Sequence, residues 1–261
     1  MPTTAETRRR AVDRYARRYR VVWRRLLSEA LGRYQRRIEV VLSPQRAVRR
    51  VLSASDLERI LAAPEEVARL LEDFPRDLIE QALREAARRE LSALGRAALM
   101  DALDIVRAAD LNLGRMVVAV SDYTRERVGA VVSEGIDRGA SIADIQSALQ
   151  RDPGFSPMRA LRIARTESAR AVAEGAQMAY QQAAMDGVDF ELEWSTAGFN
   201  ERAEHKALDG QRVAPGGLFV VPVSLKGDPA LIGRTAPGPT LFNVAALDIN
   251  CRCTLLPIVR D

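Results

Sequence analysis

Apolar residues recur every three or four positions through roughly the first 185 residues, and this spacing is typical of amphipathic helices. The clearest example runs from Tyr15 to Leu42, where the face opposite the apolar stripe consists mainly of arginine. Ser141 and Asp144 form a candidate capping box at the start of a later helix. Helices are predicted over residues 15–42, 44–52, 55–62, 64–73, 75–109, 112–139, 142–150 and 158–185.

The pattern changes after Gly187. Side chains from Phe190 to Ser195 alternate between apolar and polar, which is the period of two expected for a strand. The segments that follow are short and are separated by glycine and proline, so we expect turns and loops between brief strands. Further strands are predicted over residues 218–223, 241–246 and 254–259.

These elements predict an α+β fold with two parts. Residues 1–150 are expected to form a helical body, in which residues 1–50 are an arginine-rich N-terminal arm. Residues 156–261 are expected to form a small, loop-rich α+β domain that begins with a helix over residues 156–186. A chain of 261 residues, 47% of them apolar, is large enough to bury a core in one or two domains.

The net charge is only +4, but its distribution along the chain is uneven. The arm contains 15 arginines and four acidic residues, so the basic excess lies there. Such a helix can bind the phosphates of DNA or an acidic protein surface, and these two partners fit its charge equally well. The alternative is that its arginines pair with acidic helices of the same chain. The candidate contact residues are Arg8, Arg9, Arg10, Arg14, Arg17, Arg18, Arg24 and Arg25.

Several classes of protein can be set aside. No run approaches 18 apolar residues, so we expect no membrane span. The first twenty residues lack the apolar region of a secretory signal, so we expect the protein in the cytoplasm or in a particle assembled there. The common enzyme motifs are absent. Glu167 can be imagined as a general acid, but no partner base stands at a suitable spacing, so a structural role is favoured and no catalytic residue is assigned.

The soft metal ligands of the chain lie in its last part. His205 is the only histidine, and Cys251 and Cys253 are the only cysteines. A disulfide between such close neighbours closes a strained ring, so a reduced pair is favoured. Zn²⁺ binds thiolates and imidazole, with a water or Asp209 as fourth ligand, since Asp209 follows His205 by four residues. The alternative is a hydrogen-bonded histidine beside two small core cysteines.

Five motifs follow one another in the last hundred residues: Ile163 to Arg170, Trp194-Ser195, His205 to Gln211, Ile249 to Cys253 and Leu256-Pro257. Taken in this order, they resemble the motifs of the phage Mu F-like and SPP1-type minor head protein family. No single motif is decisive, but the ordered set is fairly specific and covers roughly residues 155–261. Arg165, Thr166 and Glu167 lie in the first motif, Trp194 in the second and Gly210 in the third, and the resemblance marks all five as structural positions.

The resemblance implies a minor head protein, or head morphogenesis protein, of a tailed phage or prophage. Such a protein binds the portal protein or the major capsid protein inside the head or at the portal vertex, and some members contact packaged double-stranded DNA. The family pattern also favours a zinc site on His205, Cys251, Cys253 and Asp209. It does not establish an enzyme. The alternatives are a metal-dependent hydrolase or nuclease injected with the genome, and a DNA-binding accessory protein.

Overall fold

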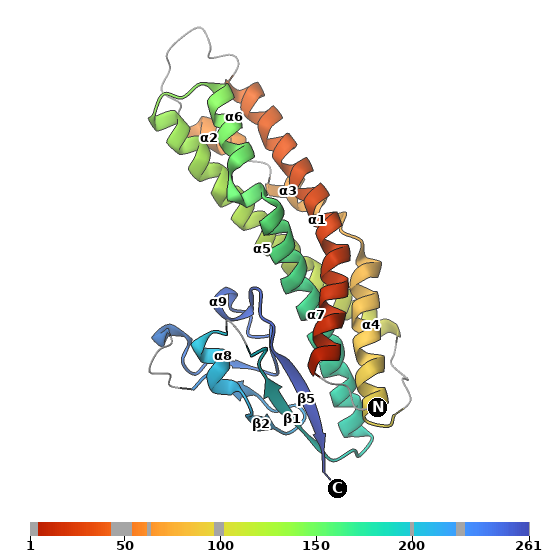
Figure 1. Cartoon of the computed structure of the whole chain (residues 1–261). Helices are drawn as coiled ribbons and strands as arrows, with labels where there is room; N and C mark the ends of the chain where they lie inside the picture. Colours follow the sequence, from red (N-terminus) through yellow and green to blue (C-terminus); the bar gives the residue numbers. More distant parts are fainter. Residues whose placement is uncertain are drawn as a thin grey trace. The chain divides into compact units, whose positions relative to one another are not determined.

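The fold was taken from a computed structural model of the chain. It describes a mostly helical protein with a small amount of sheet near the C-terminal end (Figure 1), which confirms the predicted α+β class. The helix predicted over residues 44–52 lies outside the described residues. The residues that the structure describes are 5–42, 54–61, 64–96, 102–198, 201–222 and 228–260.

The helices follow the apolar spacing of the sequence closely. The capping box of Ser141 and Asp144 is formed, and it begins the predicted helix as expected. In contrast, the helix predicted over residues 75–109 ends at Ala93, and Gly95 follows it with a left-handed φ of 69°. Residues 102–137 form one helix, so the break predicted between residues 109 and 112 is wrong. The helices are α1 (Ala5–Leu42), α2 (Ala54–Leu61), α3 (Pro64–Glu72), α4 (Arg76–Ala93), α5 (Ala102–Asp137), α6 (Ile142–Arg151), α7 (Pro157–Met185), α8 (Ala203–Leu208) and α9 (Ala245–Asp248).

The main sheet has three antiparallel strands in the order β2-β1-β5. Its central strand β1 (Phe190–Ser195) and its long neighbour β5 (Thr254–Val259) both lie where the sequence predicts strands. β2 (Arg212–Val213) covers the other edge of β1. A separate pair consists of β3 (Phe219–Val220) and β4 (Thr235–Ala236).

The strand predicted over residues 241–246 is wrong. Asn243 has a left-handed φ of 56°, and α9 begins only two residues later. The carboxylate of Asp248 accepts the backbone N–H groups of Phe242 and Val244, so this segment makes its hydrogen bonds to one side chain instead of to a neighbouring strand.

Contacts between residues group the chain into two compact units that do not follow chain order. The first unit combines the start of α1 with α4, most of α7 and the sheet, and the second combines the remaining helical segments. The division into independent domains at residues 150–156 stays a prediction. The first unit contains Met1–Tyr19, Arg76–Asn112 and Arg162–Asp261, and the second contains Arg20–Pro75 and Leu113–Leu161.

The core of the first unit lies between α7 and the main sheet. α7 presents small side chains such as Ala176 and Ala183, and the sheet presents Phe190 and Trp194. Small residues allow the helices to approach closely as well: a Cβ atom placed on Gly175 would lie 2.3 Å from the backbone oxygen of Leu83. The core therefore depends on close contact between helical backbones as well as on the burial of aromatic rings.

A buried ion pair connects three helices of the first unit. The guanidinium of Arg8 on α1 bonds to the carboxylate of Glu90 on α4, and the hydroxyl of Tyr180 on α7 donates to the same carboxylate at 3.0 Å. Arg8 is 3% exposed and Glu90 is fully buried. Because the carboxylate does not reach water, it is stabilised by Arg8, by the Tyr180 hydroxyl and by the neighbouring Arg89, whose Nε donates to it at 3.0 Å.

The second unit is helical. Trp23 stacks on Phe74 with their ring centroids 5.4 Å apart. The guanidinium of Arg159 donates to the backbone oxygen of Gly154 at 2.6 Å and to that of Val120 at 3.1 Å. Among the described helices of the chain, none is long and apolar enough to cross a membrane.

Replacing Glu90 by Gln should strongly destabilise the protein. The substitution leaves the charge of Arg8 buried without a counterion, which typically costs about 3–5 kcal/mol. The matched control is Glu85→Gln on the same helix, since Glu85 pairs with Arg14 at the surface and should contribute less than about 1 kcal/mol. Urea unfolding of the two variants measures the difference, and equal losses would contradict this account of the pair.

Candidate metal centre

His205, Cys251 and Cys253 lie together although they are far apart in the sequence. Nδ1 of His205, on α8, is 3.6 Å from Sγ of Cys251 and 3.5 Å from Sγ of Cys253. The cysteines lie in the segment that enters β5, and all three ligand atoms are within 4.8 Å of one another. The histidine and Cys251 are buried. The donor set therefore fits three of the four ligands of a tetrahedral zinc site.

The two thiols are chemically different. A hydrogen bond from the Cys253 thiol, together with the nearby His205 ring, lowers the pKa of Cys251 well below its usual value, and burial only partly opposes this. The pKa of Cys253 is raised, first because its thiol is the hydrogen-bond donor and then because it is buried. One sulfur thus favours the thiolate form that binds metal ions, while the other holds a proton that metal binding would release.

The structure does not bring Asp209 to this cluster. α8 ends at Leu208, so Asp209 follows the helix and does not share a face with His205. Its Oδ1 atom accepts hydrogen bonds from the backbone N–H of Thr196 at 2.8 Å and from the Thr196 hydroxyl at 3.0 Å. The carboxylate therefore connects the end of α8 to the end of β1.

Glu201 is a candidate ligand that the sequence did not reveal. It lines a cavity of about 110 Å³ together with His205, Cys251 and Cys253. Its Oε1 atom and the Nε2 atom of His205 are buried, and neither has a hydrogen-bond partner among the described residues. Glu201 precedes α8 and lies outside any periodic pattern, so no local signal marked it. A Glu201 oxygen is not among the ligand atoms that lie within 4.8 Å of one another, so its side chain would have to move to take the fourth position of a zinc site.

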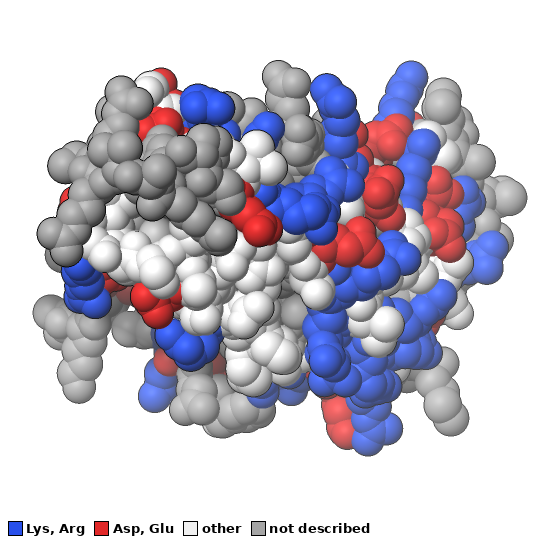
Figure 2. Space-filling view, turned by 90° about the horizontal axis from the view of Figure 1, so that it is seen from above, with Lys and Arg blue, Asp and Glu red and all other residues white. Residues whose placement is uncertain are grey.

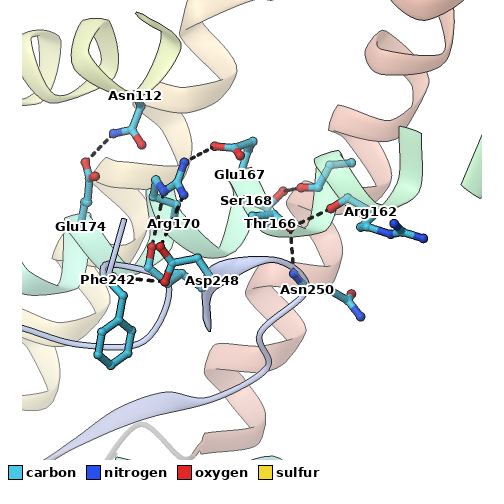
Figure 3. A network of polar contacts seen from close by, with 12 residues as sticks. Asn112, Arg162, Thr166, Glu167, Ser168, Arg170, Glu174, Phe242, Asp248 and Asn250 are labelled. Atoms are coloured by element: carbon cyan, nitrogen blue, oxygen red, sulfur yellow. Dashed lines mark hydrogen bonds and ion pairs between the residues drawn. The ribbon is translucent and has the colours of Figure 1, made fainter. Parts of the chain in front are cut away.

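The backbone next to the cysteines is fixed by polar side chains of α7 (Figure 3). The hydroxyl of Thr166 accepts the backbone N–H of Asn250 at 2.9 Å. Arg165 also donates to the side-chain oxygen of Asn250 at 3.1 Å. Asn250 has a left-handed φ of 57° directly before Cys251. These bonds therefore help to hold the chain where it turns towards the metal ligands.

A second contact of α7 lies one turn further along the helix. Arg170 donates to Glu167 at 3.0 Å and lies 3.9 Å from the carboxylate of Asp248 (Figure 3). Burial raises the pKa of Asp248, even though the backbone N–H groups of Phe242 and Val244 and the charge of Arg170 oppose the shift. Glu167 is thus part of an ion-pair network that orders the segment before the cysteines.

The sequence of the chain is similar to known proteins. The model of the family described as phage Mu protein F like protein matches residues 126–256, which is half of the chain. The chain belongs to this family. At the level of the family, membership supports a role in phage head morphogenesis. No solved structure matches the chain.

A curated protein also matches. It is the NAD⁺–arginine ADP-ribosyltransferase EFV of Enterococcus faecalis strain V583, which is 30% identical over 152 residues. The match covers 58% of this chain but only 29% of the transferase. The chain thus spans less than a third of the length of that relative. The Mu F-like family itself is structural and not enzymatic.

Within the Mu F-like region, Trp194 and Gly210 shape one wall of the cluster. Trp194 is fully buried and meets the His205 ring edge-on, with the centroids 5.6 Å apart. The backbone N–H of Gly210 donates to the Trp194 carbonyl at 2.9 Å, and Gly210 needs a φ of 75° that other residues rarely adopt. Both residues therefore position the helix that carries His205.

The predicted contact arginines of this Mu F-like protein have different environments. Arg8 is buried in its ion pair, and Arg9 donates to the backbone oxygen of Thr196. Others pair with acids on the surface, and Figure 2 shows a face on which basic and acidic side chains gather beside an area with neither. Arg10 pairs with Glu6, Arg14 with Glu85 and Arg25 with Glu29, and Arg18 donates to Gln81. The exposed members of the predicted set are Arg10, Arg14, Arg17, Arg18, Arg24 and Arg25.

Thr166→Val should loosen the segment before the cysteines. The substitution keeps the side-chain shape but removes the acceptor for the Asn250 N–H, at a cost of about 1 kcal/mol. We expect lower stability in urea and faster reaction of the cysteines with a thiol reagent. The matched control is Ser168→Ala, because among the described residues the Ser168 hydroxyl bonds to Ala164 of its own helix and to no other residue. A control that reacts as fast as Thr166→Val would contradict the positioning role.

Proposed function

We propose that this protein is a head morphogenesis protein of a tailed phage or prophage, and that it docks on the portal protein or on the inner surface of the capsid. The observation that carries the proposal is the family match over residues 126–256. The exposed arginines of α1 support it, since they offer charge to an acidic protein surface or to packaged double-stranded DNA. The particle position proposed is the capsid interior or the portal vertex.

We further propose that zinc stabilises the Mu F-like region of this chain. The residues that would hold it are His205, Cys251 and Cys253, with Glu201 at the fourth position. Zinc bound there would join α8 to the entrance of β5, two segments 46 residues apart that share little regular structure. A structural zinc site of this kind contributes directly to folding, because the unfolded chain does not hold the ligands together.

A metal-dependent hydrolase or nuclease is the second candidate. The observation that favours it is the cavity beside the cluster, since catalytic zinc sites keep one position for water or substrate. In that case Glu201 would act as a base towards a bound water instead of as a ligand. A third candidate is a DNA-binding accessory protein, in which the exposed arginines of α1 would contact phosphates.

Metal removal should unfold the C-terminal region. We expect the purified protein to contain zinc, and a strong chelator to lower its melting temperature. Cys251→Ser should lose the metal, whereas Asp209→Asn should keep it, because Asp209 bonds to Thr196. Substitution of cobalt for zinc adds a second readout: Glu201→Gln should change the visible spectrum of a four-coordinate ion if Glu201 is a ligand. Purified protein that contains no zinc, and whose melting temperature does not rise when zinc is added, would refute the zinc site.

The docking proposal makes a separate prediction. The protein should be found by mass spectrometry in purified particles and should co-purify with portal or capsid protein. Reversing the exposed charges in Arg17→Glu and Arg24→Glu together should reduce this association more than Arg138→Glu, which lies on α5 and pairs with Glu134. Absence from particles, with the protein present in the infected cell, would exclude a virion role. If moderate salt abolishes the association with portal or capsid protein, and duplex DNA alone restores it, the DNA-binding accessory protein is favoured.

A further inference from the structure

The first unit contains a cavity of about 270 Å³ that the proposed function does not use. Its walls come from the start of α1, from α4, from the middle of α7 and from the segment that contains the two cysteines. One side is apolar, with Ala169, Val172, Ala173 and Ala176 on successive turns of α7 and Leu255 on β5. All of these residues belong to a single compact unit.

The polar part of the lining consists largely of arginines. In each of three arginines, one guanidinium nitrogen donates to an oxygen. Arg9 donates to Thr196, Arg89 to Glu90 and Arg165 to Asn250. Each also has a buried nitrogen with no hydrogen-bond partner among the described residues. These nitrogens are Nε of Arg9, Nη2 of Arg89 and Nε of Arg165.

The charge of the lining is strongly positive. Arg8, Arg9, Arg89, Arg165 and Arg252 line the cavity, and Asp13 is the one acidic residue among the described lining residues. Glu90 pairs with both Arg8 and Arg89, so its single negative charge balances only one of these two arginines. The pKa of Arg165 is lowered by burial and by the like charge of Arg252. An anion in the cavity would relieve this repulsion and would provide acceptors for buried N–H groups.

We propose that the cavity binds a small phosphomonoester whose organic part is apolar. A phosphoryl group suits this lining better than a carboxylate, because it offers three terminal oxygens to donors that come from three helices and loops. The apolar wall on α7 would contact the organic part of the ligand. The volume of about 270 Å³ suits a small ligand rather than a polymer.

Binding can be tested with phenyl phosphate on the full-length protein. Calorimetry should give saturable binding with a dissociation constant below about 1 mM, and the melting temperature should rise relative to sodium chloride of equal ionic strength. Arg165→Gln should weaken binding at least about tenfold. The matched controls are Arg162→Gln and Arg88→Gln, which remove exposed arginines from the same α7 and from α4 and should leave the affinity within about twofold.

A second variant keeps the test decisive if Arg165→Gln disturbs the contact with Asn250. Ala173→Leu retains every arginine but fills the apolar side of the cavity, so it should weaken phenyl phosphate and spare inorganic phosphate. Equal affinity for benzoate would overturn the assignment to phosphoryl groups. If Arg88→Gln weakens the binding of phenyl phosphate as much as Arg165→Gln does, the effect is one of general surface charge. Displacement of phenyl phosphate by short duplex DNA would assign the site to nucleic acid. Zinc content, measured on the same samples, separates failure of this site from failure of the metal centre.

Discussion

The contact between α7 and the irregular segment of residues 240–253 holds the backbone that carries the two cysteines. That segment contains Thr240, Asn243 and Asn250, three non-glycine residues with left-handed φ angles, and it has only one short helix of its own. Such backbone is held by specific side-chain partners and not by a regular ladder. α7 provides them through Thr166 and Arg170, so the cysteines lie where the helix places their backbone.

The regular elements could be predicted from the sequence because their causes are local. The apolar spacing that predicted α7, the alternation that predicted β1 and the capping box of Ser141 all act within a few residues. The segment of residues 241–246 shows where that logic ends. Its apolar residues resemble a strand, but the buried carboxylate of Asp248 binds the same N–H groups that a neighbouring strand would bind.

The site could be predicted only in part, for a related reason. Composition alone singled out His205, Cys251 and Cys253, because each belongs to a residue type that is rare in this chain. The fourth candidate could not be found in that way. Asp209 met a helical spacing rule, but the helix ends one residue before it, whereas Glu201 reaches the cavity from a stretch without periodicity.

Charge patterning was similarly limited, since it could not distinguish Arg8, which is buried against Glu90, from the exposed arginines of the same helix.

The metal centre and the arginine-lined cavity are not independent features of the fold. Cys251, Arg252 and Cys253 line both cavities, so a single short stretch of backbone separates the proposed zinc ligands from the proposed phosphate ligands. Arg165 adds to this link, since it lines the larger cavity and also holds Asn250 next to Cys251. Ordering of this stretch by zinc would therefore set the position of Arg252 and the shape of the cavity wall. By reciprocity, an anion that holds Arg165 and Arg252 in place would favour the backbone position in which the two sulfurs meet His205.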